Sequence, residues 1–198
     1  PIAPISRYLV WPLTIFSDEH AVKAAAACIF VSEGNLKKAI EYYGADKRRC
    51  FFVESGVNPA LFKTVGYEEV EKSRRDLGFD MDDKIILNHG IMSERKNIHI
   101  LVEALKFLPP QYKLLLVGSG DTSYISKINE AISLNGVANR VVKVGYTPYP
   151  QTPIAYQISN IFVLPSSWEG LPKVVMQGLS CGIPCLVSGF RLSETIQG

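Results

Sequence analysis

The sequence predicts an α/β fold built around a parallel sheet, and three observations lead to this fold class. Short, wholly apolar runs recur along the 198-residue chain, and they are followed by Gly or Ser and then by a segment of helical period. Buried parallel strands that alternate with crossover helices produce this pattern. Hydrophobic residues make up 47% of the chain, which is enough to form a packed core.

The first part of the chain predicts one strand-helix-strand unit preceded by a helix. The opening residues are interrupted by Pro4 and Pro12, and they match neither a signal peptide nor a membrane span, which needs roughly 18 apolar residues. The expected elements are a helix over 17–27, a strand over 28–32, a helix over 35–43 and a strand over 50–54. The basic run at 47–49 lies just before the second strand and is typical of a solvated loop.

A charged segment separates this unit from the rest of the chain. Residues 66–83 read GYEEVEKSRRDLGFDMDD, in which Gly66 and Gly78 bracket a dense run of charges. Such a composition is typical of a solvated helix and linker, so we place a domain boundary here. We expect 1–65 to be the partial end of a first domain, 66–84 a charged helix or linker, and 85–198 a second domain that is truncated at its end.

The second part predicts a five-stranded parallel sheet with covering helices. The apolar runs that indicate strands lie at 85–87, 114–117, 141–144, 161–164 and 185–187. Between the first two, apolar residues recur at helical spacing over 98–105 and form one face that can cover the sheet. Further helices are expected over 124–134, which Asn135-Gly136 ends, and over 172–180, which Gly182 ends.

Charge and cysteine content exclude several function classes. The net charge is +2, from 21 basic and 19 acidic side chains, so no overall field favours nucleic acid or an anionic membrane. None of the four cysteines shows the paired two-residue spacing of zinc ribbons, and all four lie in apolar surroundings. We therefore expect reduced core thiols, no metal site and a cytoplasmic location.

Candidate ligand contacts follow the predicted strands, because an open parallel sheet binds ligands beyond its carboxyl edge. The loops there read HGIMSERKN, GSGDTS, GYTPYP and PSSWEGLPK. Glycine allows a ligand to approach the main chain, and helix amino-termini attract phosphate, so the loops suit a nucleotide diphosphate. Gly118 and Gly120 could instead simply form the turn into a helix, and Ser123 leaves the GxGxxG pattern incomplete.

Two of these loops contain charged residues that could contact a ligand directly. Lys96, with Arg95 beside it, follows the first strand and could supply positive charge to a diphosphate. In the last loop, the Glu169 carboxylate could accept bonds from sugar hydroxyls, and Gly170, Leu171 and Lys173 could present main-chain N–H groups. The plainer alternatives are a solvated Lys and a Glu that caps a helix.

The segment PSSWEGLPKVVMQGLSCGIP resembles the signature of the family-4 retaining GT-B glycosyltransferases, also described as glycosyl transferases group 1. In that family a Glu followed by Gly is separated by seven residues from a second Glu, and G-x-P follows. Here Glu169 matches the first Glu, Gln177 occupies the place of the second, and Gly182-Ile183-Pro184 completes the pattern. SGVN at 55–58, Gly90 with Lys96, and the three following strands also match, so the resemblance covers roughly residues 20–198.

The resemblance implies a two-domain enzyme with Rossmann-like halves, in which the second domain binds a nucleotide-sugar and the first, mostly outside this chain, binds the acceptor. Lys96 and Glu169 would then be the catalytic residues, on the diphosphate and the sugar respectively. The remaining substrate contacts would come from Gly90, Arg95, Gly145, Tyr146, Gly170, Leu171, Lys173 and Gln177. Of these, Gln177 would face the ribose, and Gly145 and Tyr146 would lie near the base.

Two departures from the family concern donor binding. Ile91 occupies the usual place of a phosphate-binding Arg, and Gln177 offers an amide oxygen to ribose in place of a carboxylate. Arg95 could replace the missing Arg if its side chain turns inward. The sequence Asp80-Met81-Asp82-Asp83 resembles the metal-binding Asp-x-Asp of the other glycosyltransferase fold, but it precedes a strand, which favours a solvated turn.

We therefore expect a retaining, metal-independent hexosyltransferase that moves a sugar from a nucleotide-diphosphate sugar to a glycan or lipid-linked acceptor, without a further cofactor. The alternatives are a non-catalytic nucleotide-sugar-binding module, a subunit that needs a partner, and a GT-B-like nucleotide-sugar epimerase. The fragment alone is expected to be inactive, because the acceptor side is missing. The expected partners are the nucleotide-sugar and the acceptor, not nucleic acid; peripheral contact with the inner face of the membrane through the missing domain stays open.

Overall fold

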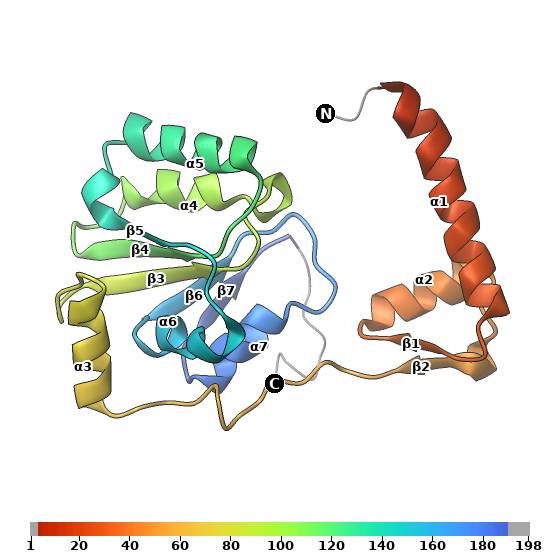
Figure 1. Cartoon of the computed structure of the whole chain (residues 1–198), viewed down its shortest axis with the longest axis horizontal. Coiled ribbons are helices and arrows are strands. Elements are labelled where there is room, and N and C mark those ends of the chain that lie inside the picture. The colour runs from red at the N-terminus through yellow and green to blue at the C-terminus, as the bar shows by residue number, and fades with distance from the viewer. Residues whose placement is uncertain (1–3, 190–198) are drawn as a thin grey trace. The chain divides into compact units, whose positions relative to one another are not determined.

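The computed structural model describes the backbone of residues 4–189 and the side chains of residues 13–189. Within this range the chain forms two compact units, and the first unit ends at Ser55 and the second begins at Gly56. Each unit is described separately below, with the element labels of Figure 1.

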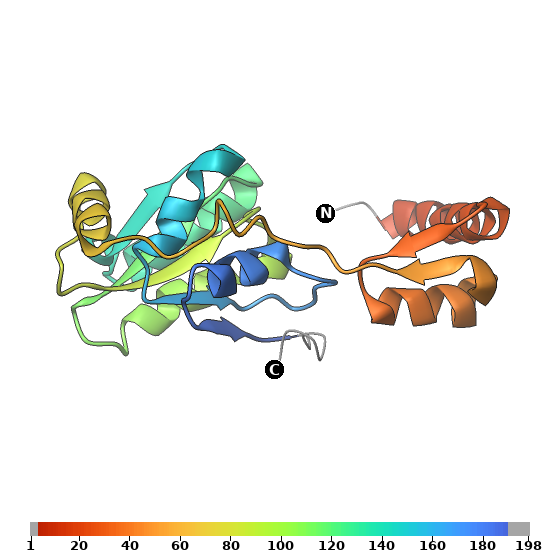
Figure 2. The ribbon, with the colours of Figure 1, turned by 90° about the horizontal axis from the view of Figure 1, so that it is seen from below.

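The first unit contains the predicted strand-helix-strand motif. Its elements are α1 (Pro4–Ala24), β1 (Cys28–Phe30), α2 (Glu33–Tyr43) and β2 (Cys50–Phe52). The two strands pair in parallel, with Cys28 opposite Cys50, and α1 and α2 lie on opposite sides of them (Figure 2). The helix expected over 17–27 instead begins at Pro4 and continues through Pro12, so our interpretation of these prolines as interruptions was wrong. Pro4 is tolerated because the first residue of a helix has no intrahelical N–H bond to lose.

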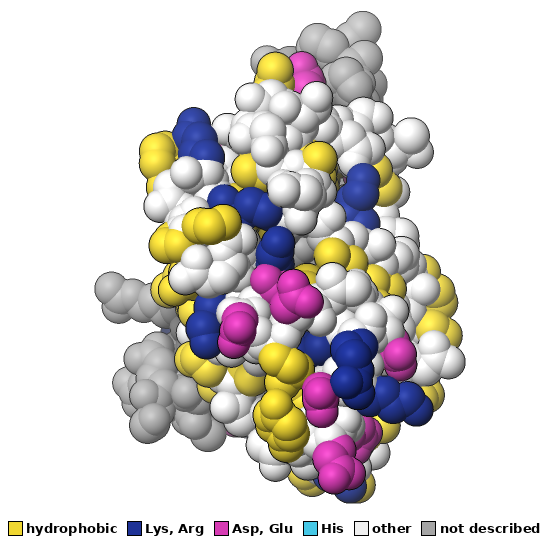
Figure 3. Space-filling model, turned by 90° about the vertical axis from the view of Figure 1, so that its left-hand side faces the viewer, with side chains coloured by type: hydrophobic (Ala, Val, Ile, Leu, Met, Phe, Trp, Pro, Cys, Tyr) yellow, Lys and Arg dark blue, Asp and Glu magenta, His cyan; other side chains and the backbone are white. Residues whose placement is uncertain are grey.

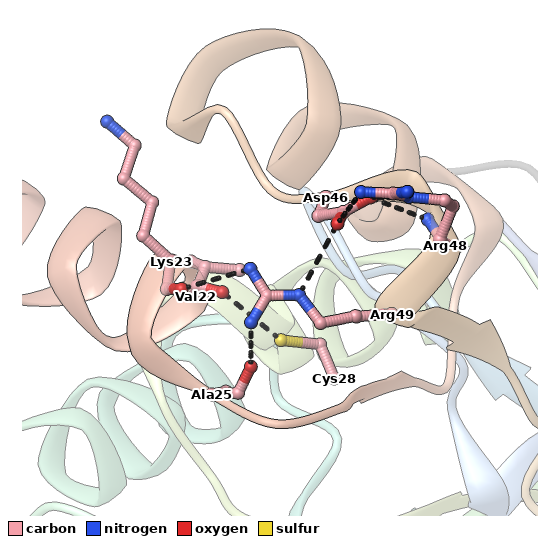
Figure 4. A network of polar contacts seen from close by, with 7 residues as sticks. All are labelled: Val22, Lys23, Ala25, Cys28, Asp46, Arg48 and Arg49. Carbon is pink, nitrogen blue, oxygen red and sulfur yellow. Dashed lines mark hydrogen bonds and ion pairs between the residues drawn. The ribbon is translucent and has the colours of Figure 1, made fainter.

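The basic run at 47–49 is more structured than a solvated loop. Arg49 donates one hydrogen bond to the carbonyl of Ala25 at 2.9 Å and another to that of Lys23 at 3.3 Å, and so satisfies carbonyls at the end of α1. Asp46 accepts from the N–H of Arg48 and lies 3.6 Å from the Arg49 Nε (Figure 4). The turn before β2 is thereby attached to the end of α1.

The second unit has a five-stranded parallel sheet, as predicted. Its strands are β3 (Lys84–His89), β4 (Tyr112–Val117), β5 (Val141–Val144), β6 (Ile161–Leu164) and β7 (Cys185–Val187), in the order β5-β4-β3-β6-β7. The helices are α3 (Tyr67–Asp76), α4 (Ile98–Leu105), α5 (Thr122–Leu134), α6 (Pro153–Gln157) and α7 (Lys173–Ser180). The predicted strands and the helices α4, α5 and α7 are confirmed, whereas α6 was not predicted.

Helices cover both faces of this sheet (Figure 1). On one face, α4 and α5 pack on Leu114 and Leu116 of β4. On the other face, Tyr156 of α6 packs its ring on Phe62 and on Phe162 of β6, with both pairs of ring centroids 5.8 Å apart. The loops described in the next subsection follow the carboxyl ends of these strands.

Segment 56–84 belongs to the second unit, although we had placed the domain boundary within it. Phe62 is fully buried, and Arg74 of α3 is 6% exposed and donates to carbonyls of Ile158, Met81 and Asp83. The segment is therefore anchored to the sheet rather than a solvated linker, and the units separate ten residues earlier than 66. The Asp83 carboxylate is also buried, and it closes the turn by accepting from the N–H of Asp80 at 2.9 Å.

The surface around α3 carries acidic, basic and apolar side chains that are intermixed, without a field of one sign (Figure 3). This arrangement agrees with the nearly balanced charge of the sequence. No helix within residues 4–189 is long and apolar enough to cross a membrane.

Candidate functional site

Two cations meet one carboxylate beyond the carboxyl ends of the neighbouring strands β3 and β6. Arg95 and Lys96 lie in the 3₁₀ turn Glu94–Lys96 that follows β3, and Glu169 lies in the loop after β6. The Glu169 Oε1 atom is 2.5 Å from the Lys96 Nζ and 2.8 Å from an Arg95 Nη. The side chains of Lys96 and Glu169 are 12% and 10% exposed, so this ion pair is shielded from solvent more than a surface pair.

The surroundings of Glu169 keep its carboxylate ionised. Burial by itself raises the pKa of Glu169, but the hydrogen bond from Lys96, the nearby Ser166 hydroxyl and the bond from Arg95 outweigh burial and hold the pKa below its usual value. Ser166 is 1% exposed, and its hydroxyl makes no hydrogen bond of normal geometry with the described residues. A ligand that reaches Glu169 would therefore also meet the buried Ser166 hydroxyl beside that carboxylate.

Contacts between the two loops hold this cluster in place. Arg95 donates to the carbonyl of Trp168 at 2.9 Å, and its guanidinium lies 4.6 Å from the centroid of the Trp168 ring. The N–H of Ser167 donates to the Arg95 carbonyl at 2.9 Å, and the Asn97 amide donates to Pro165 O and Ser167 Oγ. The cations are thus positioned by the fold before any ligand arrives.

A small cavity of about 190 Å³ lies between the loops that follow β3, β4 and β5. Its lining consists of His89, Gly90, Ile91, Gly118, Ser119, Tyr146 and Thr147. Tyr146 is 78% exposed and Ile91 is 70% exposed, so apolar surface is offered to solvent at the cavity. A Cβ atom at Gly90 or at Gly145 would meet open space, so a ligand can approach the main chain at these two glycines.

Gly118 and Gly120 have a different role. A Cβ at Gly118 would lie 2.1 Å from the Gly90 carbonyl oxygen, and one at Gly120 would lie 1.9 Å from that of Met92. The N–H of Met92 donates to the Ser119 carbonyl at 2.9 Å, which joins the two loops main chain to main chain. The geometry supports a structural role for these two glycines, since each one permits this close packing.

A buried chain of polar side chains runs from the cavity to α7. The Nδ1 atom of His89 is 2.7 Å from the Tyr156 hydroxyl, which donates to the Gln177 Oε1 at 2.8 Å. Burial lowers the pKa of His89 to about 4 and raises that of Tyr156, so both side chains are neutral at pH 7. The Gln177 oxygen, which we expected to face ribose, is occupied by Tyr156.

The remaining predicted residues lie along the same edge. Gly170 and Leu171 lie in the loop after Glu169, and their N–H groups have no hydrogen-bond partner among the residues that the structure describes. Lys173 is exposed and begins α7, whereas Gln177, one turn further, is 6% exposed. Within residues 13–189, no group of three or more His, Cys, Asp or Glu side chains could hold a metal ion.

Sequence reasoning missed Tyr156, Ser166 and Trp168, and it gave His89 no catalytic role. Tyr156 lies in α6, a five-residue helix that is too short to show a helical period. Ser166 and Trp168 stand beside the predicted Glu169, but only the folded loop shows that one is buried and the other stacks on Arg95. Sequence reasoning did place His89 at a strand end near the proposed site, and the structure puts it at the end of β3 and in the lining of the cavity.

Comparison with known proteins gives one family. The sequence profile described as "Glycosyl transferases group 1" matches residues 69–192. An uncharacterized glycosyltransferase of Methanocaldococcus jannaschii is 26% identical over 164 residues, which are 81% of this chain and 41% of that protein. A UDP-Gal:alpha-D-GlcNAc-diphosphoundecaprenol alpha-1,3-galactosyltransferase of Escherichia coli is 25% identical over 176 residues, or 86% of this chain and 44% of that protein.

Solved structures show the same fold. Anabaena HepE in complex with UDP and glucose superposes with a TM-score of 0.77 at 23% identity, over 84% of this chain and 45% of that one. WaaG, a glycosyltransferase involved in lipopolysaccharide biosynthesis, gives a TM-score of 0.75 at 18% identity, over 85% of this chain and 46% of that one. The chain thus spans less than half the length of these relatives.

Proposed function

Since the chain belongs to the group 1 family of glycosyl transferases, we propose that its second unit binds the nucleotide-diphosphate sugar that the whole protein uses as donor. The second unit contains a five-stranded parallel sheet, and the chain has the GT-B fold of the similar structures. The observation that carries the proposal is the cluster of Arg95, Lys96 and Glu169 at the carboxyl edge of this sheet. Ligands of open α/β sheets bind at this edge.

Lys96 and Arg95 would hold the diphosphate. Both point inward to the same carboxylate oxygen, so two positive charges already lie together where a dianion could replace that carboxylate as their partner. Arg95 in this position would replace the phosphate-binding Arg that the family usually has at position 91. This chain has an exposed Ile there. Positive charge fixed beside the departing diphosphate lowers the barrier to breaking the sugar–phosphate bond.

Glu169 would change partners when the donor binds. Without a donor its carboxylate neutralises the two cations, and with a donor it is free to accept bonds from sugar hydroxyls. The unpaired N–H groups of Gly170 and Leu171 and the buried Ser166 hydroxyl would add donors on the same side. The acceptor hydroxyl would attack on the face that the diphosphate leaves and pass its proton to that leaving group, which retains the configuration without a covalent intermediate.

The cavity beside Tyr146 and Gly145 would take the base. Its volume of about 190 Å³ and its exposed aromatic side chain suit a flat ring. UDP-sugars are the first donors to test, because two of the similar proteins have UDP or a UDP-sugar in their descriptions. A glycan or lipid-linked acceptor would bind to parts of the polypeptide outside this chain, so we expect the chain alone to transfer no sugar.

A second candidate is a donor-binding module without catalysis. It is favoured by Ile91 and Gln177, which stand where the family usually has charged side chains. Donor binding without transfer by the longer polypeptide, under conditions in which an active relative transfers sugar, would select this candidate.

Calorimetric titration tests the donor site. We would titrate the chain with UDP, UDP-glucose, GDP-mannose and ADP-glucose, and compare Lys96→Met with Lys106→Met, a matched control on an exposed lysine at the end of α4. One nucleotide type should bind saturably, and Lys96→Met should weaken it roughly 10- to 100-fold, as expected for a charge-assisted bond, while Lys106→Met should not. Absence of binding across the panel, or equal effects of the two substitutions, would refute the proposal.

A further inference from the structure

Two cysteines of the first unit face each other across its two strands. Cys28 begins β1 and Cys50 begins β2, and the parallel pairing places the two residues directly opposite each other. Residues paired in this way project to the same face of a sheet, and neighbouring strands are about 4.8 Å apart. A disulfide needs Cα atoms about 4.4–6.8 Å apart, so the backbone permits a bond between these two residues.

The environment of the two thiols brings them together near the end of α1. Both side chains are half-buried, so they are not the core thiols expected from the sequence. The Cys28 Sγ donates a weak hydrogen bond to the Val22 carbonyl at 3.6 Å, in the stretch where Arg49 also binds the Ala25 carbonyl (Figure 4). Partial burial, followed by the neighbouring Cys28, raises the pKa of Cys50, whereas the charge of Arg49 lowers it. The two thiols therefore interact with each other, as the register requires.

A cavity gives solvent access to one of the two cysteines. Cys28 lines the cavity of about 580 Å³ between α1, β1 and α2, and Cys50 is not among its lining residues. Asp18 and Lys38 line it as well, so charged side chains of both signs stand beside the apolar ones. A small charged molecule that enters this cavity meets Cys28 before Cys50.

We propose that Cys28 and Cys50 form a reversible redox pair, in which Cys28 reacts with a low-molecular-weight disulfide and Cys50 then closes a bond between β1 and β2. The Cys28 thiolate attacks one sulfur of the small disulfide, forms a mixed disulfide and releases the other half as a thiol. The Cys50 thiolate then attacks the Cys28 sulfur and releases the second half. Two protein thiols are thereby oxidised to a disulfide, and the small disulfide takes up their two electrons and two protons as two thiols.

This bond would fasten the weaker of the two units. It would close a loop over 28–50, which contains α2 (Glu33–Tyr43). Among the side chains that the structure describes, Ala39 and Ala45 are the buried apolar residues of the first unit. A disulfide restricts the unfolded chain, and units with a small core depend most on such a bond. The redox state would therefore set the stability of the first unit and leave the second unit unchanged.

Thiol counting in a glutathione buffer tests the pair. We would incubate the folded chain with glutathione disulfide, alkylate the remaining thiols in denaturant, and locate every modification by peptide mass spectrometry. The unmodified chain should lose two of its four thiols, link the peptides that contain Cys28 and Cys50, and keep no glutathione. Cys50→Ser should keep one glutathione on Cys28, and Cys28→Ser should react at least about tenfold more slowly. Dithiothreitol should restore all four thiols of the unmodified chain.

The other two cysteines are a control pair within the same chain. Cys181 is 4% exposed, and burial raises the pKa of both Cys181 and Cys185 to about 11. They should stay reduced, and Cys181→Ala should leave the oxidation of the first unit unchanged. Four free thiols after incubation, a lasting glutathione adduct on the unmodified chain, or a link that includes Cys181 or Cys185 would overturn the inference.

Hydrogen exchange measures the effect of the bond on the fold. After oxidation, exchange in 28–30 and 50–52 should slow by at least about tenfold, while exchange in 84–89 stays the same. Cys28→Ser, treated in the same way, should show no change in either unit. If exchange in the first unit of the oxidised chain is unchanged or faster, the bond does not stabilise this unit and the proposed role is wrong.

Discussion

In the proposed donor site, Glu169 and a donor diphosphate would compete for the same two cations. Replacing Glu169 by Gln should therefore have opposite effects on two ligands: it frees Lys96 and Arg95 for UDP, but it weakens the acceptor that sugar hydroxyls need. We expect UDP to bind about 3- to 10-fold more tightly, and the additional affinity of the UDP-sugar over UDP to disappear. Calorimetry with the two ligands measures both changes.

Glu94→Gln is the control for this charge change. Glu94 lies in the same turn but pairs with Lys127 at 2.9 Å, on the solvent-exposed side. It should alter neither affinity by more than about twofold, because exposed pairs contribute little. An unchanged or lower UDP affinity in Glu169→Gln would show that the carboxylate does not compete with the diphosphate.

His89 makes the stability of the chain depend on pH. Burial lowers the pKa of His89 from 6.5 to about 4. Between these pH values the unfolded chain therefore binds a proton at this histidine, whereas the native state does not. The free energy of unfolding should therefore fall as the pH is lowered from about 6.5 to 4, by about 3 kcal/mol in total. Carboxylates whose pKa is lowered, such as Glu169, change the free energy of unfolding only below about pH 4.5. The upper part of this pH range therefore reports the titration of His89.

Urea unfolding at pH 7, 5.5 and 4.5 checks this prediction. The variant His89→Asn retains a side-chain N–H that can reach Tyr156 and has no group that titrates, so its unfolding midpoint should vary less over the same range. Identical pH dependence in the variant and the unmodified protein would assign the effect to another group.

At the scale of single residues, sequence reasoning selected Lys96 and Glu169 by their charge and by their position in loops after strands. Lys96 and Glu169 follow apolar runs, and the structure brings them into contact. The contact of Gln177 with Tyr156 was not readable, because Tyr156 lies 21 positions earlier in the chain and in a helix of only five residues. A pattern of residue types does not show which distant side chains meet in the fold.

At the scale of elements, Arg74 attaches α3 to the start of the sheet. Its guanidinium donates to the Ile158, Met81 and Asp83 carbonyls and to the Asn160 side chain, at 2.8 to 3.1 Å. Arg74→Met should destabilise the second unit by about 3 kcal/mol, since buried acceptors lose their donor. The midpoint of urea unfolding, at an unchanged m-value, measures this loss.

The neighbouring residue provides the control. Arg75 is 66% exposed in its side chain and pairs with Glu71 on the outer face of α3. Arg75→Met should change the stability by no more than about 0.5 kcal/mol. Equal effects of the two substitutions would mean that the buried bonds of Arg74 do not anchor the helix.

The same helix shows why some elements were predicted and others not. Strands such as β4 have a continuous apolar run, because both of their faces are covered. The segment that contains α3 has only one buried cation within a run of charges, and nothing in the sequence distinguishes Arg74 from Arg75. Pro12 misled the prediction of α1 for a related reason. Local propensity disfavours proline inside a helix, yet the helix continues through this position, so local propensity alone does not determine it.

At the scale of the molecule, the two units differ in how much core they have. The second unit buries apolar side chains on both faces of its sheet, among them Leu114, Leu116 and Phe162. In the first unit, Ala39 and Ala45 are the buried apolar residues among the side chains that the structure describes. A cavity of about 580 Å³ opens there between α1, β1 and α2, and Ile29, Phe51 and Val53 are more than half exposed.

This difference predicts two levels of stability within one chain. Native-state hydrogen exchange should show amides of β1 and β2 opening at a free energy at least about 3 kcal/mol lower than those of β3 and β4, because local stability follows buried apolar contact. Deuterium uptake of peptides from 28–30 and 84–89 measures both. In a longer polypeptide, additional residues that cover Ile29 and Phe51 should slow exchange in β1 and leave that of β3 unchanged. Equal protection of the two sheets in the isolated chain would show that the first unit is stabilised by contacts other than its own core.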